Sequence, residues 1–311
     1  MAEAKGVSHT WGWATTRAIL VSVRPRQWTK NLIIYFAFFF TINQAWSLDE
    51  SGEAARLFAR TTVAFILFCL ITGAVYLLND VLDAEQDRHH PRKRHRPIAA
   101  RALPAPLALS VATALGVGGL ALAFALSPPF ALVALIYLAI MVAYSTYLKR
   151  LIIVDVMAIS AGFVLRAAAG AVALDVTISP WLYVCTSLGA LFLGFAKRLN
   201  EVVLAGESGP LQRETLEEYT PRLLEQLIAI VAPATLVSYI LYTFTADFLP
   251  ENQVMMLTIP FVMYGLFRYL YLVHHRNLGE SPEEVLLTDV PLVLDIVLWL
   301  LSASAILLVF R

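Results

Sequence analysis

The 311-residue sequence has few charged residues and almost no cysteine. Charged residues make up 15% of the chain, whereas soluble proteins average about 25%, so the composition excludes a soluble enzyme and a disordered chain. The two cysteines, Cys69 and Cys185, each lie inside an apolar stretch, which excludes a secreted disulfide scaffold. The 23 basic and 23 acidic residues cancel, which argues against a protein that works by general attraction to nucleic acid.

Hydrophobic residues are abundant instead, at 59% of the chain with a mean hydropathy of +0.70. A helix that crosses a bilayer needs about 20 mostly apolar residues. Nine segments meet or approach this length: 29–47, 58–79, 104–126, 129–148, 152–173, 180–199, 223–247, 252–273 and 289–310. The short first segment is bracketed by Trp28 and Trp46, a residue type favoured at membrane interfaces. The sequence therefore predicts an all-α polytopic membrane protein of about nine helices in one bundle.

The basic residues are distributed unevenly between the two sides of the predicted bundle. Most Lys and Arg residues lie in the N-terminal segment and in the loops after even-numbered spans. Cationic loops mark the cytoplasmic face of a membrane protein, so we expect an integral inner (cell) membrane protein with a cytoplasmic N-terminus. Residues 1–28 are expected to form a cytoplasmic amphipathic segment at the membrane surface, and residues 29–311 a single transmembrane domain.

An acidic motif follows the second predicted span. Asp80, Asp83 and Asp87 are spaced at i, i+3 and i+7, which places all three carboxylates on one face if the helix continues. Such a face requires a compensating cation, and hard oxygen ligands suit Mg²⁺, which often bridges to substrate phosphates. An ordinary solvated helix end is the alternative. We interpret the motif, with the adjoining Asn79, as a metal–phosphate site.

A basic run, 89–97, follows the acidic motif directly. Its simplest interpretation is a loop that fixes the topology. A functional interpretation is that some of its cations, Lys93 and Arg96 among them, bind phosphate oxygens. Its histidines lie too close together, without a cysteine or a distant partner, to predict a zinc site.

These motifs resemble those of a known family. Asn79-Asp80-x-x-Asp83-x-x-x-Asp87, followed by Arg96-Pro97-Ile98, resembles the first aspartate motif of the UbiA superfamily of intramembrane prenyltransferases. The segment Tyr144-Ser145-x-x-x-Lys149-Arg150 is also similar to that family. The resemblance implies a helical bundle that binds Mg²⁺-diphosphate at the cytoplasmic side of a polar, lipid-accessible cavity.

One branch of the superfamily matches more closely. Arg24-Pro25-Arg26-Gln27-Trp28 and Lys197-Arg198-x-x-Glu201 resemble the decaprenyl-phosphate phosphoribosyltransferase branch. Typical prenyltransferases carry a second Asp-x-x-x-Asp motif after span six, where this chain has Lys197 and Arg198. Two cations at that place suit a donor with an extra phosphate, such as 5-phosphoribosyl 1-pyrophosphate.

The resemblance implies a transferase that moves 5-phosphoribose from this donor to a polyprenyl (decaprenyl-type) phosphate lipid during cell-envelope biosynthesis. It implies Mg²⁺ as cofactor, held by Asn79, Asp80, Asp83 and Asp87, with Glu201 assisting the metal or positioning the ribose. Candidate phosphate-binding cations are Lys30, Lys93, Arg96, Lys149, Arg150, Arg166, Lys197 and Arg198. The expected partners are the lipid and the membrane, with a homo-oligomer open and no nucleic acid.

Several alternatives stay open. The chain could be a conventional UbiA-type enzyme that moves an isoprenoid from a prenyl diphosphate to an aromatic or other acceptor. A transporter is a weaker alternative, because the charges cluster at helix ends instead of near the bilayer midplane. Arg166 and Asp295 lie inside predicted spans, where a charge costs at least about 2.5 kcal/mol. They pair with each other, or Arg166 binds a ligand phosphate.

Overall fold

The computed structural model describes residues 7–89, 93–177, 179–208, 214–246, 248–250, 252–276 and 282–310. Within these residues the chain is helical and has no strand, only one isolated bridge between Ile42 and Trp46. Eight of the described helices are long and apolar enough to cross a membrane. These helices are α3 (Ser51–Leu82), α5 (Ala105–Leu126), α6 (Pro128–Thr146), α7 (Val154–Leu174), α8 (Pro180–Ser208), α10 (Pro221–Thr245), α11 (Ile259–Arg276) and α13 (Val290–Phe310). The prediction of an all-α integral membrane protein is confirmed.

Shorter helices connect or precede these spans. The short α-helices are α1 (Val7–Ser22), α2 (Phe36–Phe40), α4 (Ala84–His89), α9 (Glu214–Glu218) and α12 (Pro282–Thr288). The 3₁₀ helices are η1 (Pro25–Tyr35), η2 (Lys93–His95), η3 (Leu148–Arg150) and η4 (Val254–Thr258).

The predicted first span, 29–47, differs from a single long helix. The 3₁₀ helix η1 is followed by the five-residue helix α2, and Asn43 then takes a left-handed conformation with φ of 56°. The Trp46 indole N–H donates a 2.9 Å hydrogen bond to the Phe38 carbonyl, which folds the segment back. Asn43 Nδ2 also donates to the Leu307 carbonyl at 3.1 Å, in the last turn of α13, where helix carbonyls lack intrahelical partners. Apolar composition set the expected length, but these polar contacts end the helix early.

The chain divides into two compact units. The first comprises Met1–Leu32 and Ala64–Tyr147, and the second Ile33–Val63 and Leu148–Arg311.

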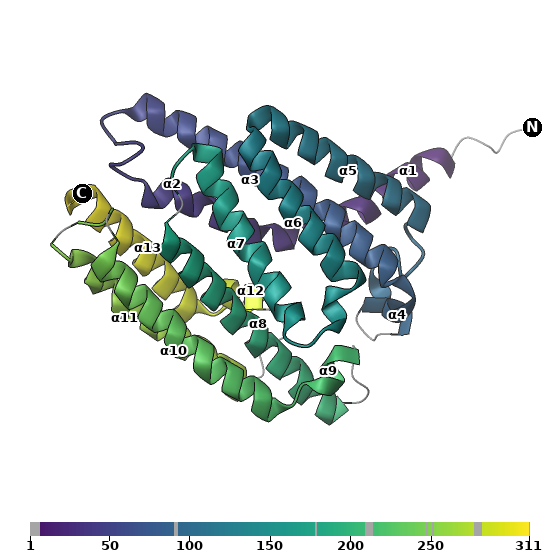
Figure 1. The fold of residues 1–311 in the computed structure, drawn as a ribbon. Coiled ribbons are helices and arrows are strands. Elements are labelled where there is room, and N and C mark those ends of the chain that lie inside the picture. The colour runs from purple at the N-terminus through teal and green to yellow at the C-terminus, as the bar shows by residue number, and fades with distance from the viewer. Residues whose placement is uncertain are drawn as a thin grey trace, which may run out of the picture. The chain divides into compact units, whose positions relative to one another are not determined.

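In the first unit, small residues let the helices approach closely. The buried residues of α5 are all Ala or Gly, spaced three or four apart: Ala108, Ala112, Gly116, Gly119 and Ala123. A Cβ added at Gly119 would lie 2.8 Å from Ile71 Cγ1 of α3, so this face packs directly against α3. Helix α6 lies beside α5 (Figure 1). Such small-residue faces are typical of helices that associate inside a bilayer.

In the second unit, α7 is the most buried helix. Most of its side chains are enclosed, and a Cβ added at Gly170 would overlap the Ile34 carbonyl oxygen. Helices α7 and α10 both pack along α8, and α11 packs against α13 (Figure 1). Aromatic and aliphatic side chains of α8, α10 and α11 form the largest apolar cluster of this unit, which includes Phe192, Leu224 and Tyr269.

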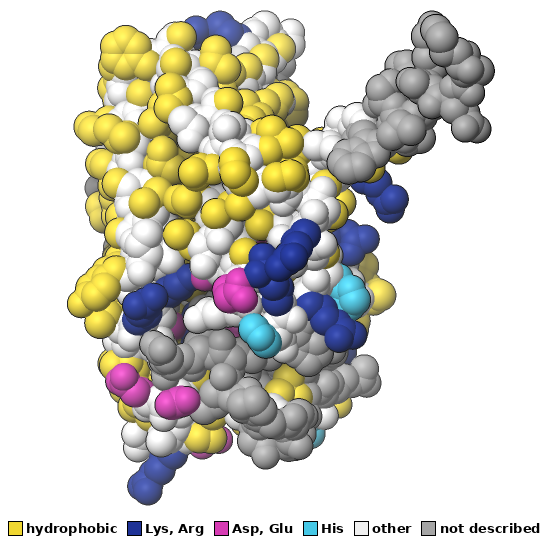
Figure 2. Space-filling model, turned by 90° about the vertical axis from the view of Figure 1, so that its right-hand side faces the viewer, with side chains coloured by type: hydrophobic (Ala, Val, Ile, Leu, Met, Phe, Trp, Pro, Cys, Tyr) yellow, Lys and Arg dark blue, Asp and Glu magenta, His cyan; other side chains and the backbone are white. Residues whose placement is uncertain are grey.

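Apolar side chains also cover much of the surface. On α13, for example, Leu294, Leu298, Leu301 and Val309 are exposed. Figure 2 shows hydrophobic side chains over much of the face it draws. An apolar exterior is expected where lipid tails are the solvent.

Candidate active site

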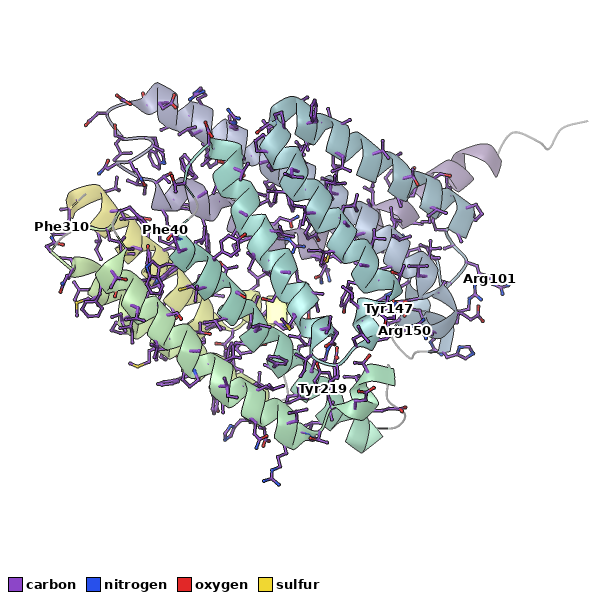
Figure 3. The ribbon with its side chains drawn as sticks, in the orientation of Figure 1. Phe40, Arg101, Tyr147, Arg150, Tyr219 and Phe310 are labelled. Carbon is purple, nitrogen blue, oxygen red and sulfur yellow. The ribbon has the colours of Figure 1, made fainter. Side chains whose placement is uncertain are left out.

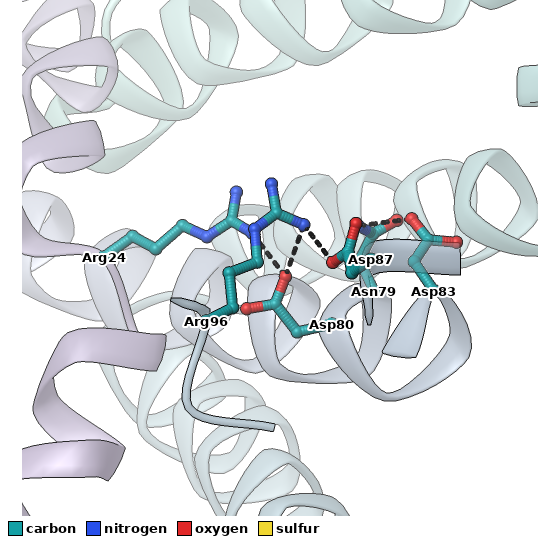
Figure 4. Close-up of polar contacts among 6 residues, drawn as sticks. All are labelled: Arg24, Asn79, Asp80, Asp83, Asp87 and Arg96. Carbon is teal, nitrogen blue, oxygen red and sulfur yellow. Dashed lines mark hydrogen bonds and ion pairs between the residues drawn. The ribbon is translucent and has the colours of Figure 1, made fainter. Parts of the chain in front are cut away.

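The acidic motif lies where α3 gives way to α4 in the first unit. The Asp83 amide donates to the Asn79 carbonyl and the Asp87 amide to the Asp83 carbonyl, each at 2.9 Å, so helical bonding carries across the junction. Asp80 and Asp87 are buried and share one partner. Arg96 Nη1 lies 3.2 Å from Asp80 Oδ1 and 2.6 Å from Asp87 Oδ2 (Figure 4). The predicted shared face therefore brings these two carboxylates together.

A second arginine, Arg24, also binds Asp80. Its guanidinium forms an ion pair with Asp80 Oδ1 (Figure 4) and lies over the Tyr76 ring, 5.0 Å from the centroid. Arg24 has a left-handed backbone with φ of 55°, which is uncommon for a residue with a side chain. Sequence reasoning did not include Arg24 among the site residues. The signal was present in the Arg24-Pro25-Arg26-Gln27-Trp28 motif.

Asp83 and Asn79 form a separate pair on the same helix end. Asn79 Nδ2 donates a 3.0 Å hydrogen bond to Asp83 Oδ2, as expected for side chains four residues apart. Asp83 is only half-buried, unlike Asp80 and Asp87. It is the more accessible carboxylate of the motif.

The chemistry of these donors suits a hard cation. Among the described residues, no group of three or more His, Cys, Asp or Glu side chains is arranged so that it could hold a metal ion. The acidic motif nevertheless binds a positive charge between two carboxylates, because one guanidinium nitrogen of Arg96 contacts both Asp80 and Asp87. Carboxylate and amide oxygens are the ligands that Mg²⁺ prefers. The chemistry of these side chains therefore fits a divalent cation, which Asn79, Asp80, Asp83 and Asp87 would hold.

The other candidate cations of the first unit, Lys30 and Lys93, lie on two 3₁₀ helices. Lys30 is half-buried on η1 and Lys93 half-buried on η2. Lys93 and Arg96 share the turn that follows the acidic motif, and the Arg96 amide donates to the Lys93 carbonyl at 2.9 Å. Residues 90–92 of the basic run lie outside the described residues.

The second unit contains a buried ionic cluster around Arg198 of α8. Arg198 Nε donates to Asp155 Oδ2 at 2.8 Å and Nη1 to Glu201 Oε2 at 2.5 Å. The side chains of Arg198 and Asp155 are 3% and 2% exposed. The Tyr219 hydroxyl donates to Asp155 Oδ1 at 2.8 Å. The structure thus gives Arg198, a predicted phosphate ligand, two carboxylate partners.

Burial shifts the titration of the tyrosine in this cluster. Removal from water raises the pKa of the Tyr219 hydroxyl, and the hydrogen bond to the Asp155 carboxylate raises it further. Both effects disfavour a phenolate. Tyr219 is therefore a hydrogen-bond donor to Asp155 throughout the physiological pH range. Neither Asp155 nor Tyr219 was a predicted site residue, although Tyr219 lies in a motif that resembles the family.

The remaining predicted cations of the second unit lie in three different settings. Lys149 and Arg150 form η3, where Lys149 is half-buried and Arg150 exposed, and Lys197 is half-buried on α8. Arg166 is buried in α7, donates to the Gly162 carbonyl at 2.9 Å and lies over the Phe163 ring. Arg150 and Tyr219 lie at one end of this unit, and Phe40 and Phe310 at the other (Figure 3).

Asp295 of α13, a charge inside a predicted span, faces α11. A Cβ added at Gly265 would lie 3.1 Å from Asp295 Oδ2, so the absence of a side chain at Gly265 makes room for the carboxylate. Nearby, Arg268 Nη2 of α11 pairs with Asp289 Oδ2 at 2.9 Å, and Asp289 Oδ1 accepts from the Leu292 amide at the start of α13. Asp289 therefore acts as a helix N-terminal acid.

Comparison with curated proteins finds relatives over most of the chain. A decaprenyl-phosphate phosphoribosyltransferase of Mycolicibacterium smegmatis is 35% identical over 298 residues, covering 92% of this chain and 91% of the relative. The protein of that name from Corynebacterium glutamicum is 34% identical over 281 residues, covering 87% and 81%.

Solved structures show the same fold. A UbiA homolog from Archaeoglobus fulgidus bound to GPP and Mg²⁺ superposes with a TM-score of 0.71, covering 93% of this chain and 99% of its own, at 18% identity. The family model described as the UbiA prenyltransferase family matches residues 32–202. That range takes in the acidic motif, the Lys149–Arg150 segment, and Arg198 with its two carboxylate partners. The family resemblance predicted from sequence is thereby confirmed: this chain belongs to the UbiA prenyltransferase family.

Proposed function

We propose that this protein transfers the 5-phosphoribosyl group of 5-phosphoribosyl 1-pyrophosphate to a polyprenyl phosphate, giving polyprenylphosphoryl-5-phosphoribose and pyrophosphate. The observation that carries this proposal is the 34–36% identity, over most of the chain, to proteins named decaprenyl-phosphate phosphoribosyltransferase. Lys197, at the place where the family resemblance leads one to expect a second acidic motif, favours the same donor.

The acidic motif of the first unit is the proposed site for the donor's pyrophosphate. Asp80, Asp83 and Asp87, with Asn79, would hold Mg²⁺, which when bound neutralises the charge that develops on the leaving pyrophosphate. Arg96 and Arg24 contact Asp80, and a guanidinium at either position can also bind phosphate oxygens. Lys30 and Lys93 are further candidates for binding the donor's phosphates.

The reaction itself requires little proton transfer. An oxygen of the lipid phosphate attacks the anomeric carbon of the ribose. The bond from that carbon to pyrophosphate breaks, and the electron pair leaves with pyrophosphate. A phosphate monoester is largely ionised near neutral pH, so no strong general base is needed. The protein's task is to orient the two anions and offset their charge, with inversion expected at the anomeric carbon.

The membrane location follows from the acceptor. A polyprenyl chain is insoluble in water, whereas the phosphoribosyl donor is polar, so the reaction must occur where lipid and water meet. The predominance of Lys and Arg in the N-terminal segment and in the loops after even-numbered spans supports a site on the cytoplasmic side of the cell membrane.

The direct test is product formation by purified protein in detergent. We expect labelled phosphoribosyl pyrophosphate, a polyprenyl phosphate and Mg²⁺ to give a labelled lipid, and chelation of Mg²⁺ to stop its formation. A parallel reaction supplies a prenyl diphosphate and an aromatic acid. Product in that reaction alone would replace the proposal with a conventional prenyltransferase.

A further inference from the structure

The short helix α9 and the residues after it are tied to the connection between α6 and α7 by two side-chain hydroxyls. Thr215 Oγ1 donates to the Lys149 carbonyl at 2.7 Å. The Tyr219 hydroxyl accepts from the Ile153 amide at 2.7 Å while it donates to Asp155 at 2.8 Å. Thr215 and Tyr219 are both buried, at 3% exposure. Their partners lie more than 60 residues away in the sequence, so these contacts are tertiary.

The backbone of this connection needs outside support. Ile153 has φ of 67°, in the left-handed region that a β-branched side chain rarely adopts. Such strain persists only where surrounding contacts impose it. Ile153 immediately precedes α7, and its amide finds its acceptor in Tyr219. The tyrosine hydroxyl is thus one of the contacts that stabilise the strained turn.

The same hydroxyl is linked to α8 through Asp155. Asp155 accepts from Tyr219 with one oxygen and from Arg198 with the other, and Arg198 reaches Glu201. The hydroxyl, carboxylate and guanidinium therefore connect α9 to two groups of cations. These are the Lys149–Arg150 pair of η3 and the Lys197–Arg198 pair inside α8.

We propose that Thr215 and Tyr219 are positioning residues, which form a clamp that holds η3 and the Lys197–Arg198 segment of α8 in the arrangement that recognises the phosphates of an anionic sugar donor. This inference rests on the proposed function and deepens it. Arg198, held between Asp155 and Glu201, belongs to the framework of the clamp, and Lys149, Arg150 and Lys197 supply the positive charge.

The test compares two conservative tyrosine substitutions. Tyr219→Phe removes the clamp's hydroxyl. Tyr239→Phe removes another buried hydroxyl of the same unit, which bonds to Thr258 and Trp299 instead. We expect Tyr219→Phe to raise the KM for phosphoribosyl pyrophosphate about tenfold with little change in kcat, and Thr215→Val to act in the same direction. Equal kinetics in Tyr219→Phe and Tyr239→Phe would overturn the proposal.

A rescue variant separates positioning from general stability. Glycine adopts positive φ without strain, so Ile153→Gly should restore much of the donor KM of Tyr219→Phe although it adds no contact. A purely structural loss would instead deepen with a second substitution. Failure of the double variant to recover any donor affinity would contradict the role assigned to Ile153.

Hydrogen exchange tests the clamp without relying on activity. Amides of 148–156 should exchange faster in Tyr219→Phe than in the unsubstituted protein or in Tyr239→Phe. If the unsubstituted protein forms no labelled lipid, the proposed function fails, and the exchange result alone then decides whether the clamp exists. Unchanged exchange would overturn it.

Discussion

Asp155 is expected to be a structural weak point of the second unit. Its carboxylate binds Arg198 with one oxygen and the Tyr219 hydroxyl with the other, and the side chains of Asp155 and Arg198 are 2% and 3% exposed. Asp155→Ala leaves Arg198 with Glu201 as its carboxylate partner in this cluster. Asp155→Asn keeps an acceptor for one partner but removes the charge.

The cost of an uncompensated buried charge sets the upper limit of the magnitude, because Arg198 keeps Glu201 as a carboxylate partner. Breaking a buried ion pair by removing one partner costs about 3–5 kcal/mol, and loss of the hydrogen bond from Tyr219 adds to that. For a chain of this size the loss corresponds to a fall of roughly 5–10 °C in melting temperature. Asp155→Asn should cost less, about 1–3 kcal/mol, because it leaves the pair's geometry largely intact.

The decisive variant removes both charges. Replacing a buried pair with apolar side chains is often neutral, so Asp155→Ala/Arg198→Met should be more stable than Asp155→Ala alone. Apparent melting temperatures are measured in detergent by loss of the monodisperse peak on heating. Glu53→Gln, which breaks the exposed pair with Arg56 in the same unit, should leave the melting temperature unchanged. The electrostatic reasoning is refuted if the double variant loses as much stability as the two single variants together.

Three further predictions concern the site and the packing. Asp83→Ala should abolish labelled-lipid formation and the Mg²⁺-induced rise in melting temperature, while the metal-free melting temperature changes little because Asp83 is only half-buried. Glu85→Gln, on the same helix end, is the control. Normal turnover in Asp83→Ala would remove the metal assignment. Gly170→Ala should lower the free energy of unfolding by more than about 3 kcal/mol, because its Cβ would overlap the Ile34 carbonyl oxygen. Gly189→Ala has open space and should raise it by up to about 1 kcal/mol. Equal yields of folded protein for the two variants would contradict this packing. Burial and Asp155 raise the pKa of Tyr219 above its ordinary value of about 10, so the hydroxyl's contribution to folding stability is complete below about pH 10 and lost as the pH rises further. The difference in melting temperature between the unsubstituted protein and Tyr219→Phe should therefore be constant up to about pH 9 and shrink above about pH 10. A difference that disappears near neutral pH would contradict the assignment.

The local features of the fold could be predicted from the sequence. Long apolar stretches predicted the helices correctly from 58–79 to 289–310, because helix length follows from bilayer thickness and backbone hydrogen bonding. The spacing of Asp80 and Asp87 correctly indicated a shared face, because side chains seven residues apart stack on a helix. For the segment 29–47 the prediction of a single long helix was wrong, because Asn43 and Trp46 bond to backbone carbonyls that only the folded chain brings near them.

The long-range contacts of the site depended on the tertiary structure. Arg24 lies 56 residues before Asp80, and Arg198 lies 43 residues after Asp155. Nothing in either spacing indicates contact. Only the structure therefore distinguishes the individual cations: Arg198 is buried between carboxylates, whereas Arg150 is exposed.

By itself, the sequence determined the chemical class of the protein. Few charges in a very apolar chain require a membrane bundle, and three aspartates beside a basic run predict a phosphate-handling motif. The tertiary structure decided which charges neutralise each other: Arg24 and Arg96 with Asp80, and Arg198 with Asp155. The physical reason is that composition and spacing act locally, whereas an ion pair between distant residues forms only where helix packing places both charges out of water.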